Sequence, residues 1–203
     1  MTFDDSSNQI IGGSTSTQFY NLTSNSSDTV RLDTTITVNY NLDIASGVLD
    51  CEAKQITGNV SGTITLAAGT TLILGSLSSS TNVTFPTSYT SAHASISSTS
   101  TVIYQANTSS QTIASTFTYG NLVVASRSYP LTKTSSGGTL LTVTGNLTIN
   151  TAAFSLGIKS LNLTGNLIIN GKLSFSSGSM YLYGNFTNNG TFVTTGGNVT
   201  FTG

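Results

Sequence analysis

Two distant segments of the chain match position by position, and this repetition constrains the fold more than any other feature. Residues 62–75 read GTITLAAGTTLILG and residues 171–184 read GKLSFSSGSMYLYG. Glycine stands at the first, eighth and last positions of both, and apolar residues take the same slots between them. Self-similarity over such a distance is typical of repeat architectures, in which stacked units bury a shared core.

Further matches extend the repeat over most of the chain. Residues 36–44 match 141–149, residues 54–56 match 159–161, and residues 6–11 match 109–113. We therefore predict two tandem copies, residues 1–101 and 102–203, with the opening of a third copy at 198–203. About a dozen extra Ser- and Thr-rich residues at 79–95 are predicted to form a loop that bulges from one coil of the first copy.

A shorter period runs inside each copy. The dipeptide Gly-Asn followed by an apolar residue recurs, and the steps from Gly145 to Gly165 to Gly184 are 20 and 19 residues. This spacing suits one coil of a parallel β-helix. We expect the glycines to adopt the left-handed conformation of a sharp corner, and each following Asn to stack on the Asn of the next coil in a hydrogen-bonded ladder.

Apolar and polar residues alternate between the corners, which is the pattern of short β-strands. Leu147 and Ile149 are predicted to face inward and Thr148 outward. In the segment 180–183 either Met180 and Leu182 or the two tyrosines could face the core, and we expect the tyrosines outside, where their hydroxyl groups are hydrated. The predicted fold class is all-β, a right-handed parallel β-helix (β-solenoid) with coils of about 20 residues.

Charge is scarce, with six basic and seven acidic residues among 203. The basic residues are scattered singly, which excludes a nucleic-acid-binding surface, since such a surface needs clustered Lys and Arg. No apolar run approaches the ~20 residues of a membrane helix, so we expect no membrane insertion. The first residues contain no secretory signal, and we expect a signal that has been removed or a segment of a longer chain.

All seven acidic residues lie within the first 52 positions, so most of the chain lacks carboxylates for acid–base catalysis. Asp43, Asp50 and Glu52, with Lys54, are the nearest approach to a β-helix active site, which uses several acidic and basic residues on adjacent coils. They indicate either a weak cation or sugar site or, as we expect, solvated outward positions. We predict no enzymatic activity, no cofactor and no metal site.

Two further single residues have chemical potential. His93, the only histidine, lies within the expected loop without evident partners, so we expect a solvent-exposed side chain rather than a catalytic or metal-binding one. Cys51, the only cysteine, aligns with Leu156, which occupies a core slot in the other copy. A buried and inert thiol is therefore expected rather than a nucleophile.

Asn-x-Ser/Thr sequons are numerous. Those that follow a corner glycine are expected to act as ladder residues, while all of them are potential N-glycosylation sites if the source organism modifies such chains. The ten sequon residues are Asn21, Asn25, Asn59, Asn82, Asn107, Asn146, Asn162, Asn185, Asn189 and Asn198.

These repeat units resemble the large repetitive bacterial surface proteins of the filamentous-haemagglutinin-like, β-helical type. The resembling segments are FYNLT at Phe19, TGNLTI at Thr144, TGNLII at Thr164 and NNGTFVTTGGNVTFTG at Asn188. The resemblance covers nearly the whole chain and implies an adhesin, stalk or fibre at the cell surface or outside the cell. The secretion-signal domain usual in such proteins is not seen.

Three functions of different classes follow. The first is a structural or adhesive segment of an extracellular surface fibre, with surface glycans as potential partners. The second is a carbohydrate-binding or carbohydrate-cleaving β-helix of tailspike type, which predicts aromatic and acidic residues clustered in one groove. The third is an ice-binding solenoid, which needs Thr-x-Thr on consecutive coils. Three pairs fit this motif, but we expect Asp43, Thr148 or Ile168 on the neighbouring coils, which would break the array. The pairs are Thr35 and Thr37, Thr63 and Thr65, and Thr142 and Thr144.

A β-solenoid exposes unpaired strand edges at its ends, and natural ones usually cover them with a cap or with charged residues. The chain has no charge after Lys172, and its last residues match its first ones. We therefore predict that the chain joins head to tail with copies of itself or with further repeats. The predicted self-assembly edge consists of Thr2 and Phe3 at one end and Val199 and Phe201 at the other.

Overall fold

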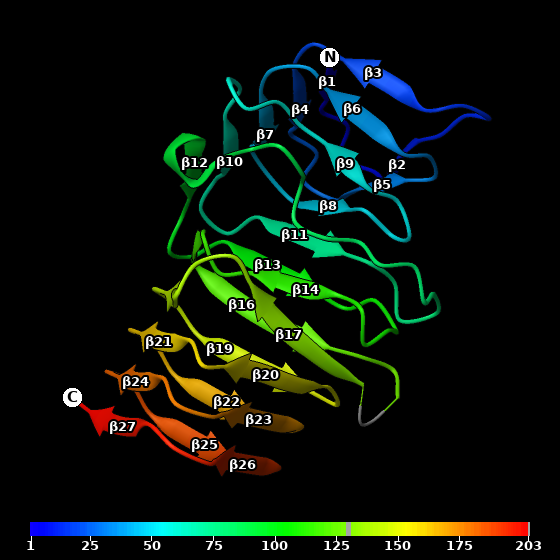
Figure 1. The fold of residues 1–203 in the computed structure, drawn as a ribbon. Coiled ribbons are helices and arrows are strands. Elements are labelled where there is room, and N and C mark those ends of the chain that lie inside the picture. Colours follow the sequence, from blue (N-terminus) through cyan, green and yellow to red (C-terminus); the bar gives the residue numbers. More distant parts are fainter. Residues whose placement is uncertain (129–130, 203) are drawn as a thin grey trace.

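The computed structural model describes residues 1–128 and 131–202, so Gly203 of the predicted second copy lies outside the described residues. The chain forms a β-solenoid of about ten turns in which every pair of neighbouring strands is parallel (Figure 1). One short 3₁₀ helix, η1 (Ser91–His93), is the only helix among these residues. The predicted all-β solenoid class is confirmed.

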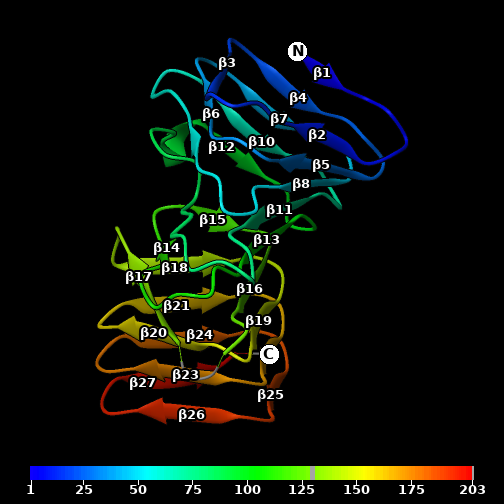
Figure 2. The same ribbon diagram turned by 90° about the vertical axis from the view of Figure 1, so that its right-hand side faces the viewer.

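One sheet runs along the whole solenoid and forms one of its faces (Figure 2). In spatial order its nine strands are β2 (Gln9–Ile11), β5 (Thr29–Leu32), β8 (Val48–Asp50), β11 (Thr71–Leu74), β13 (Thr101–Tyr104), β16 (Asn121–Ala125), β19 (Leu147–Asn150), β22 (Leu167–Ile169) and β25 (Phe186–Asn188).

The other two faces are each divided into an amino-terminal and a carboxyl-terminal sheet. The amino-terminal sheets are β3 (Thr17–Phe19), β6 (Ile36–Val38) and β9 (Ile56–Thr57) on one face, and β1 (Thr2–Phe3), β4 (Leu22–Ser24), β7 (Leu42–Ile44), β10 (Ile64–Leu66) and β12 (Ala94–Ile96) on the other. The carboxyl-terminal sheets are β14 (Thr112–Ala114), β17 (Thr132–Ser136), β20 (Ala153–Gly157), β23 (Lys172–Phe175) and β26 (Thr191–Thr194), and β15 (Thr118–Tyr119), β18 (Leu140–Val143), β21 (Ser160–Leu163), β24 (Ser179–Leu182) and β27 (Asn198–Phe201).

The strand register confirms the predicted coil length. Leu147 pairs with Leu167 and Leu167 with Phe186, which are steps of 20 and 19 residues. The coils are longer in the middle of the chain, where Leu72 pairs with Val102 and Leu122 with Leu147. The solenoid is therefore regular at its carboxyl-terminal end and irregular near its centre.

The core is a column of inward-facing aliphatic and aromatic side chains that runs through all coils. Leu147, Ile149, Leu161 and Leu163 are buried, as predicted. Met180 and Leu182 are also buried, while Tyr181 and Tyr183 remain 42% and 48% exposed, which confirms the expected register of that strand. In the matched segment 62–75 the residues that align with these tyrosines are Leu72 and Leu74, and both are buried. The buried positions of the two matched segments therefore coincide in the first strand of each segment but not in the second.

The predicted Asn ladder is present at the corner that precedes the nine-stranded sheet. The side-chain oxygen of each Asn accepts a hydrogen bond from the backbone N–H of the residue one coil further on. This bond is 2.9 Å from Asn146 N to Asn121, 2.8 Å from Asn166 N to Asn146, and 2.9 Å from Asn185 N to Asn166. The ladder satisfies one donor on each coil at a place where the chain turns.

Most corner glycines serve a different purpose from the predicted one. Gly197 does adopt a positive φ, of 84°, but Gly145, Gly165 and Gly184 do not, so the left-handed conformation expected for these three was wrong. Instead, a Cβ added at Gly165 would lie 2.3 Å from the carbonyl oxygen of Gly145, and one at Gly184 would lie 2.5 Å from that of Gly165. Glycine is required because successive corners stack backbone on backbone.

The matched sequence segments do not occupy the same faces of the solenoid. Residues 36–44 form β6 and β7, while residues 141–149 form β18 and β19, the second of which belongs to the nine-stranded sheet. Each of these matched strands thus lies one face further around the axis, whereas β23 and β24 of residues 171–184 lie one face back from β10 and β11 of residues 62–75. The boundary at residue 101 stays a prediction, but a strand–corner–strand unit evidently fits any face.

Residues 75–139, here called the junction, connect the amino-terminal sheets to the carboxyl-terminal ones. The predicted loop within it is not a simple surface bulge, because Val83, Phe85 and Tyr89 are buried and complete the core where the sheet of β3, β6 and β9 ends. Thr87 still forms a parallel bridge with Thr57. Only the nine-stranded sheet crosses the junction without interruption.

Candidate functional sites on the ends and faces

The carboxyl-terminal coil presents apolar side chains that belong to inward-facing columns. Val199 pairs with Met180 and Phe201 with Leu182, and both partners are buried. Phe201 is itself 61% exposed, because no described coil covers it. Phe186 lies 5.4 Å from Phe192 and 6.1 Å from Phe201 between ring centroids. Phe186, Phe192, Val199 and Phe201 together form an aromatic-rich surface patch, here called the end patch.

The amino-terminal coil has a less apolar end. Phe3 is half-buried and packs edge-on against Phe19, with ring centroids 6.5 Å apart. Thr2 is exposed on β1, next to Thr23 of β4. Gln9 pairs with Val30, which faces the core, so Gln9 places a polar side chain at the end of that inward-facing column.

The outermost strands at the two ends occupy corresponding faces. β2 and β25 are the first and last strands of the nine-stranded sheet. Along the chain that sheet is followed by the face of β3 or β26, and then by the face of β1 or β27. Each end of the solenoid thus has one exposed strand edge on each of its three faces, and the three faces follow one another in the same order around the axis at both ends. Head-to-tail stacking requires this correspondence.

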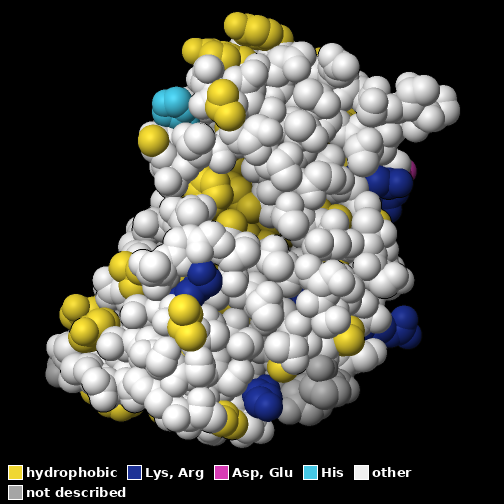
Figure 3. Space-filling view, in the orientation of Figure 1, with side chains coloured by type: hydrophobic (Ala, Val, Ile, Leu, Met, Phe, Trp, Pro, Cys, Tyr) yellow, Lys and Arg dark blue, Asp and Glu magenta, His cyan; other side chains and the backbone are white. Residues whose placement is uncertain are grey.

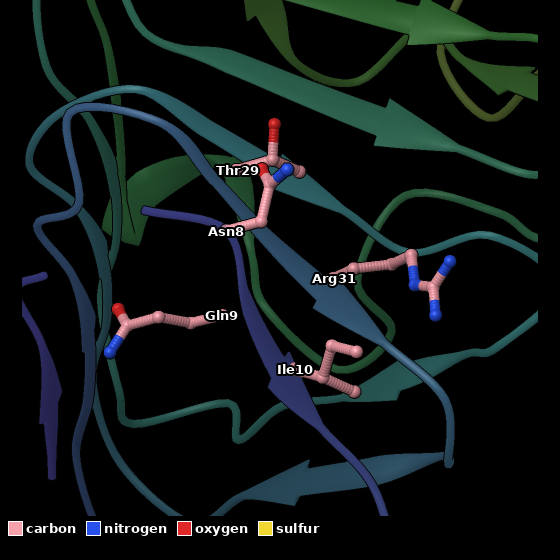
Figure 4. Close-up of a pocket in the computed structure, with 5 residues that line it drawn as sticks. All are labelled: Asn8, Gln9, Ile10, Thr29 and Arg31. Carbon is pink, nitrogen blue, oxygen red and sulfur yellow. The ribbon is translucent and has the colours of Figure 1, made fainter. Parts of the chain in front are cut away.

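A shallow surface hollow of about 330 Å³ lies beside β2 and β5 (Figure 4). It is lined by Asn8, Gln9, Ile10, Thr29 and Arg31, of which Gln9 points to the opposite side of β2 from Ile10. Arg31 is paired with Asp33, at 3.1 Å between nitrogen and carboxylate oxygen. The hollow contains one paired cation and no carboxylate among its lining residues, which gives it no groups for acid–base catalysis.

Of the acidic residues singled out from the sequence, Asp50 and Glu52 lie next to each other, but Asp43 lies on a different face. Asp43 lies on β7 between Thr23 and Thr65, whereas Asp50 lies on β8 of the nine-stranded sheet, opposite Arg31. Burial raises the pKa of Asp50, although a bond from the Glu52 backbone N–H and the charge of Arg31 partly offset this. Among the described residues no group of three or more His, Cys, Asp or Glu side chains could hold a metal ion.

Cys51 and His93 lie where the sequence predicted. Cys51 is fully buried, and burial raises the pKa of its thiol well above the usual value of 9.0, which keeps it protonated and unreactive. His93 is exposed at the end of η1, where its Nδ1 lies 2.9 Å from the carbonyl oxygen of Val60.

The sequons divide into ladder and surface positions. Asn21 and Asn146 accept hydrogen bonds from the next coil, and Asn189 donates to Asn170 in a second ladder. Asn25 accepts a hydrogen bond from the Ser46 hydroxyl group one coil further on. The remaining sequon residues are Asn59, Asn82, Asn107, Asn162, Asn185 and Asn198, of which Asn82, Asn185 and Asn198 are exposed.

The outer surface of the sheet of β15, β18, β21, β24 and β27 corrects one expectation about the Thr-x-Thr motif. The neighbours of Thr142 on adjacent coils are Thr118 and Asn162, followed by Tyr181 and Thr200. Thr148 and Ile168, which were expected to break this array, lie on the nine-stranded sheet instead. The row is interrupted by Asn162 and by the exposed Tyr181, and a second exposed tyrosine, Tyr183, follows two residues later. This surface is therefore a polar face with an aromatic pair rather than a Thr array.

A buried polar cluster in the junction was missed by sequence reasoning. Lys133 of β17 and Gln111, just before β14, are both fully buried, as are Tyr104 and Tyr119, whose hydroxyl groups lie 2.8 Å apart. The alternation Leu131, Lys133, Ser135 was the available signal, since it places Lys133 on the inward side of its strand.

On the face shown in Figure 3 charge is sparse, with Lys and Arg side chains as isolated points, in keeping with the six basic and seven acidic residues of the sequence. The described residues include no helix with the length and apolarity needed to span a membrane. Comparisons with models of known families, with curated proteins and with solved structures gave no match for this chain.

Proposed function

We propose that the chain is a structural segment of an extracellular surface fibre or adhesin, of the filamentous-haemagglutinin-like kind that its repeat units resemble. The observation that carries the proposal is the end patch, in which side chains of the inward columns are left uncovered in register for a further coil. Such a coil would bury Phe186 and Phe201, at roughly 25 cal/mol per Å² of apolar surface. It would come from more of the same chain or from a second copy.

Two further features support a fibre. The strand edges at the two ends correspond face by face, so stacked copies would continue all three faces in parallel. The end patch also carries no charged residue, and charged residues are the usual means by which sheet edges discourage association.

The proposal is tested by placing a charge in the end patch. We expect Val199→Lys combined with Phe201→Lys to abolish end-to-end assembly, followed by light scattering and electron microscopy, because lysine in an inward column cannot be buried without a partner. Thr200→Lys is the matched control, since Thr200 lies between them on the outward side of β27. Fibres of unchanged length in the double variant would contradict this joint.

A second candidate, binding of neutral carbohydrate, is favoured by the exposed pair Tyr181 and Tyr183 on an uncharged sheet face. Aromatic rings beside hydroxyl and amide groups suit sugar rings. Replacing both tyrosines by Thr would restore the type of residue found on neighbouring coils. We expect that variant to lose retention on insoluble polysaccharides such as cellulose or chitin, while equal retention of both proteins would reject this candidate.

A further inference from the structure

The junction contains a lysine and a glutamine in direct contact inside the core. Lys133 Nζ donates to Gln111 Oε1 at 2.7 Å and to the carbonyl oxygen of Ala106 at 2.5 Å. Gln111 Oε1 also accepts from the Ala106 backbone N–H at 3.0 Å. Its Nε2 donates to the carbonyl oxygens of Leu74 and Val83. Every polar atom of the pair is thus oriented by the backbone.

The position of this pair in the solenoid is unusual. Gln111 precedes β14 and Lys133 lies on β17, which are the first two strands of their sheet. They join consecutive coils where the other two faces of the solenoid are interrupted and only the nine-stranded sheet continues. A strong link here would reinforce the least continuous part of the column.

The amine of Lys133 lies in surroundings that favour its neutral, nucleophilic form. Burial lowers its pKa to about 8, so an appreciable fraction is unprotonated near neutral pH. All acidic residues lie within the first 52 positions of the chain. The other buried titratable side chains that the structure describes in the junction are Tyr89, Tyr104 and Tyr119, and burial raises the pKa of all three. The hydroxyl groups of Tyr104 and Tyr119 hydrogen-bond to each other.

We propose that Lys133 and Gln111 condense to form an intramolecular isopeptide bond. The lone pair of neutral Lys133 Nζ attacks Gln111 Cδ, the Nζ–Cδ bond forms, and negative charge develops on Oε1. The Ala106 N–H donates to this oxygen and stabilises the charge. A proton passes from Nζ to Nε2, the Cδ–Nε2 bond breaks, and ammonia leaves.

The reaction relies on proximity. Holding a nucleophile against a carbonyl group can raise its effective concentration to roughly 10⁵–10⁸ M. Without a carboxylate to transfer the proton the step is slow, but it needs to occur only once in each molecule. The cross-linked fraction should therefore grow with the age of the folded protein and grow faster as the pH rises to about 8.

The test is the intact mass of the purified chain after incubation of the folded protein at pH 7, 8 and 9. We expect a growing species lighter by one ammonia, with a peptide in which Lys133 and Gln111 are joined. Loss of ammonia from Asn170-Gly171 or Asn189-Gly190 gives the same mass, but it leaves residues 111 and 133 in separate peptides.

Two variants serve as controls. Lys133→Met removes the nucleophile and is expected to fold, because the residues beside it on the next coils, Phe154 and Leu173, are apolar. Lys133→Arg retains a cation that does not condense. Neither should form the lighter species with a joined peptide. Folded wild-type protein that keeps residues 111 and 133 in separate peptides after prolonged incubation at pH 9 would overturn the proposal.

Discussion

The carboxyl-terminal coils and the junction differ in how their buried polar groups find hydrogen-bond partners. From β18 to β27 the coils advance by 19 or 20 residues, and the strands pair in register from coil to coil apart from one register shift between β20 and β23. In the junction two sheets stop, two others begin, and single side chains replace missing strands. Gln111 donates to the carbonyl oxygens of Leu74 and Val83, a role that backbone N–H groups perform in the regular coils.

The difference shows what repetition contributes to stability. In the regular coils the backbone N–H and C=O groups of each strand pair with those of the next coil, so no special residue is needed to satisfy them. In the junction, where the regular strand pairing is interrupted, backbone groups that lack a strand partner need side-chain partners. Lys133 and Gln111 provide these hydrogen bonds there, and the structure describes no equivalent pair on the regular coils. The regular coils should therefore respond to changes in apolar volume, and the junction to changes in polar partners.

The largest expected effect is in the apolar column of the regular coils. Leu147→Ala should lower the free energy of unfolding by about 2 to 5 kcal/mol, because it leaves a cavity in a fully buried column. Phe175→Ala should have a similar effect. Thr148→Ala is the matched control on the same strand and should change little, since Thr148 faces outward. Equal effects of the two substitutions in chemical denaturation would refute the assignment of inward and outward faces.

A smaller effect should follow from crowding a corner. Gly165→Ala places a methyl group against the carbonyl oxygen of Gly145, and overpacking of this kind costs about 1 to 3 kcal/mol. Gly12→Ala is the control, since the nearest atom to its Cβ would lie 3.6 Å away. The two can be compared by thermal unfolding, and a harmless Gly165→Ala would show that the corners are not closely stacked.

The junction should respond to pH where the regular coils do not. Burial lowers the pKa of Lys133 from 10.5 to about 8, so between these values the unfolded chain holds a proton that the folded chain has released. The stability of freshly prepared protein should therefore rise with pH above 8, by less than about 1.4 kcal/mol per pH unit. Above pH 9 the raised pKa of Cys51 acts in the opposite direction, because only the unfolded chain then ionises its thiol.

The window for this measurement is accordingly pH 8 to 9. Lys133→Met should abolish the rise in stability over that interval, in urea denaturation series at each pH. Persistence of the same rise in the variant would assign it to another group.

The smallest effect is expected for an exposed ion pair that lies outside both the regular coils and the junction. Arg31 and Asp33 form an exposed ion pair, and such pairs contribute about 0 to 1 kcal/mol. Asp33→Asn should change stability by no more than this, and by less in high salt. A larger loss in thermal unfolding would indicate that the hollow beside β2 depends on the pair.

Repetition in the sequence was sufficient to predict the solenoid, its coil length and most inward positions, because equivalent positions recur one coil apart, as at Leu147 and Leu167. It could not reveal the cluster of Lys133 and Gln111, since a contact that occurs once leaves no period. It also misjudged the neighbours of Thr142, because assigning a strand to a face requires counting strands through the irregular junction. The corner glycines were recognised from the sequence, but the reason that glycine is needed there is the close contact between successive coils, which no local sequence pattern encodes.

The displacement of matched segments around the axis has a consequence for how a fibre of such repeats would look from outside. Residues 141–149 lie one face further than residues 36–44, and residues 171–184 lie one face back from residues 62–75. If further copies were displaced in this way, equivalent side chains would not line up along one side of the shaft but would be distributed over its three sides. A single added or deleted strand would then be enough to change which groups neighbouring fibres present to each other.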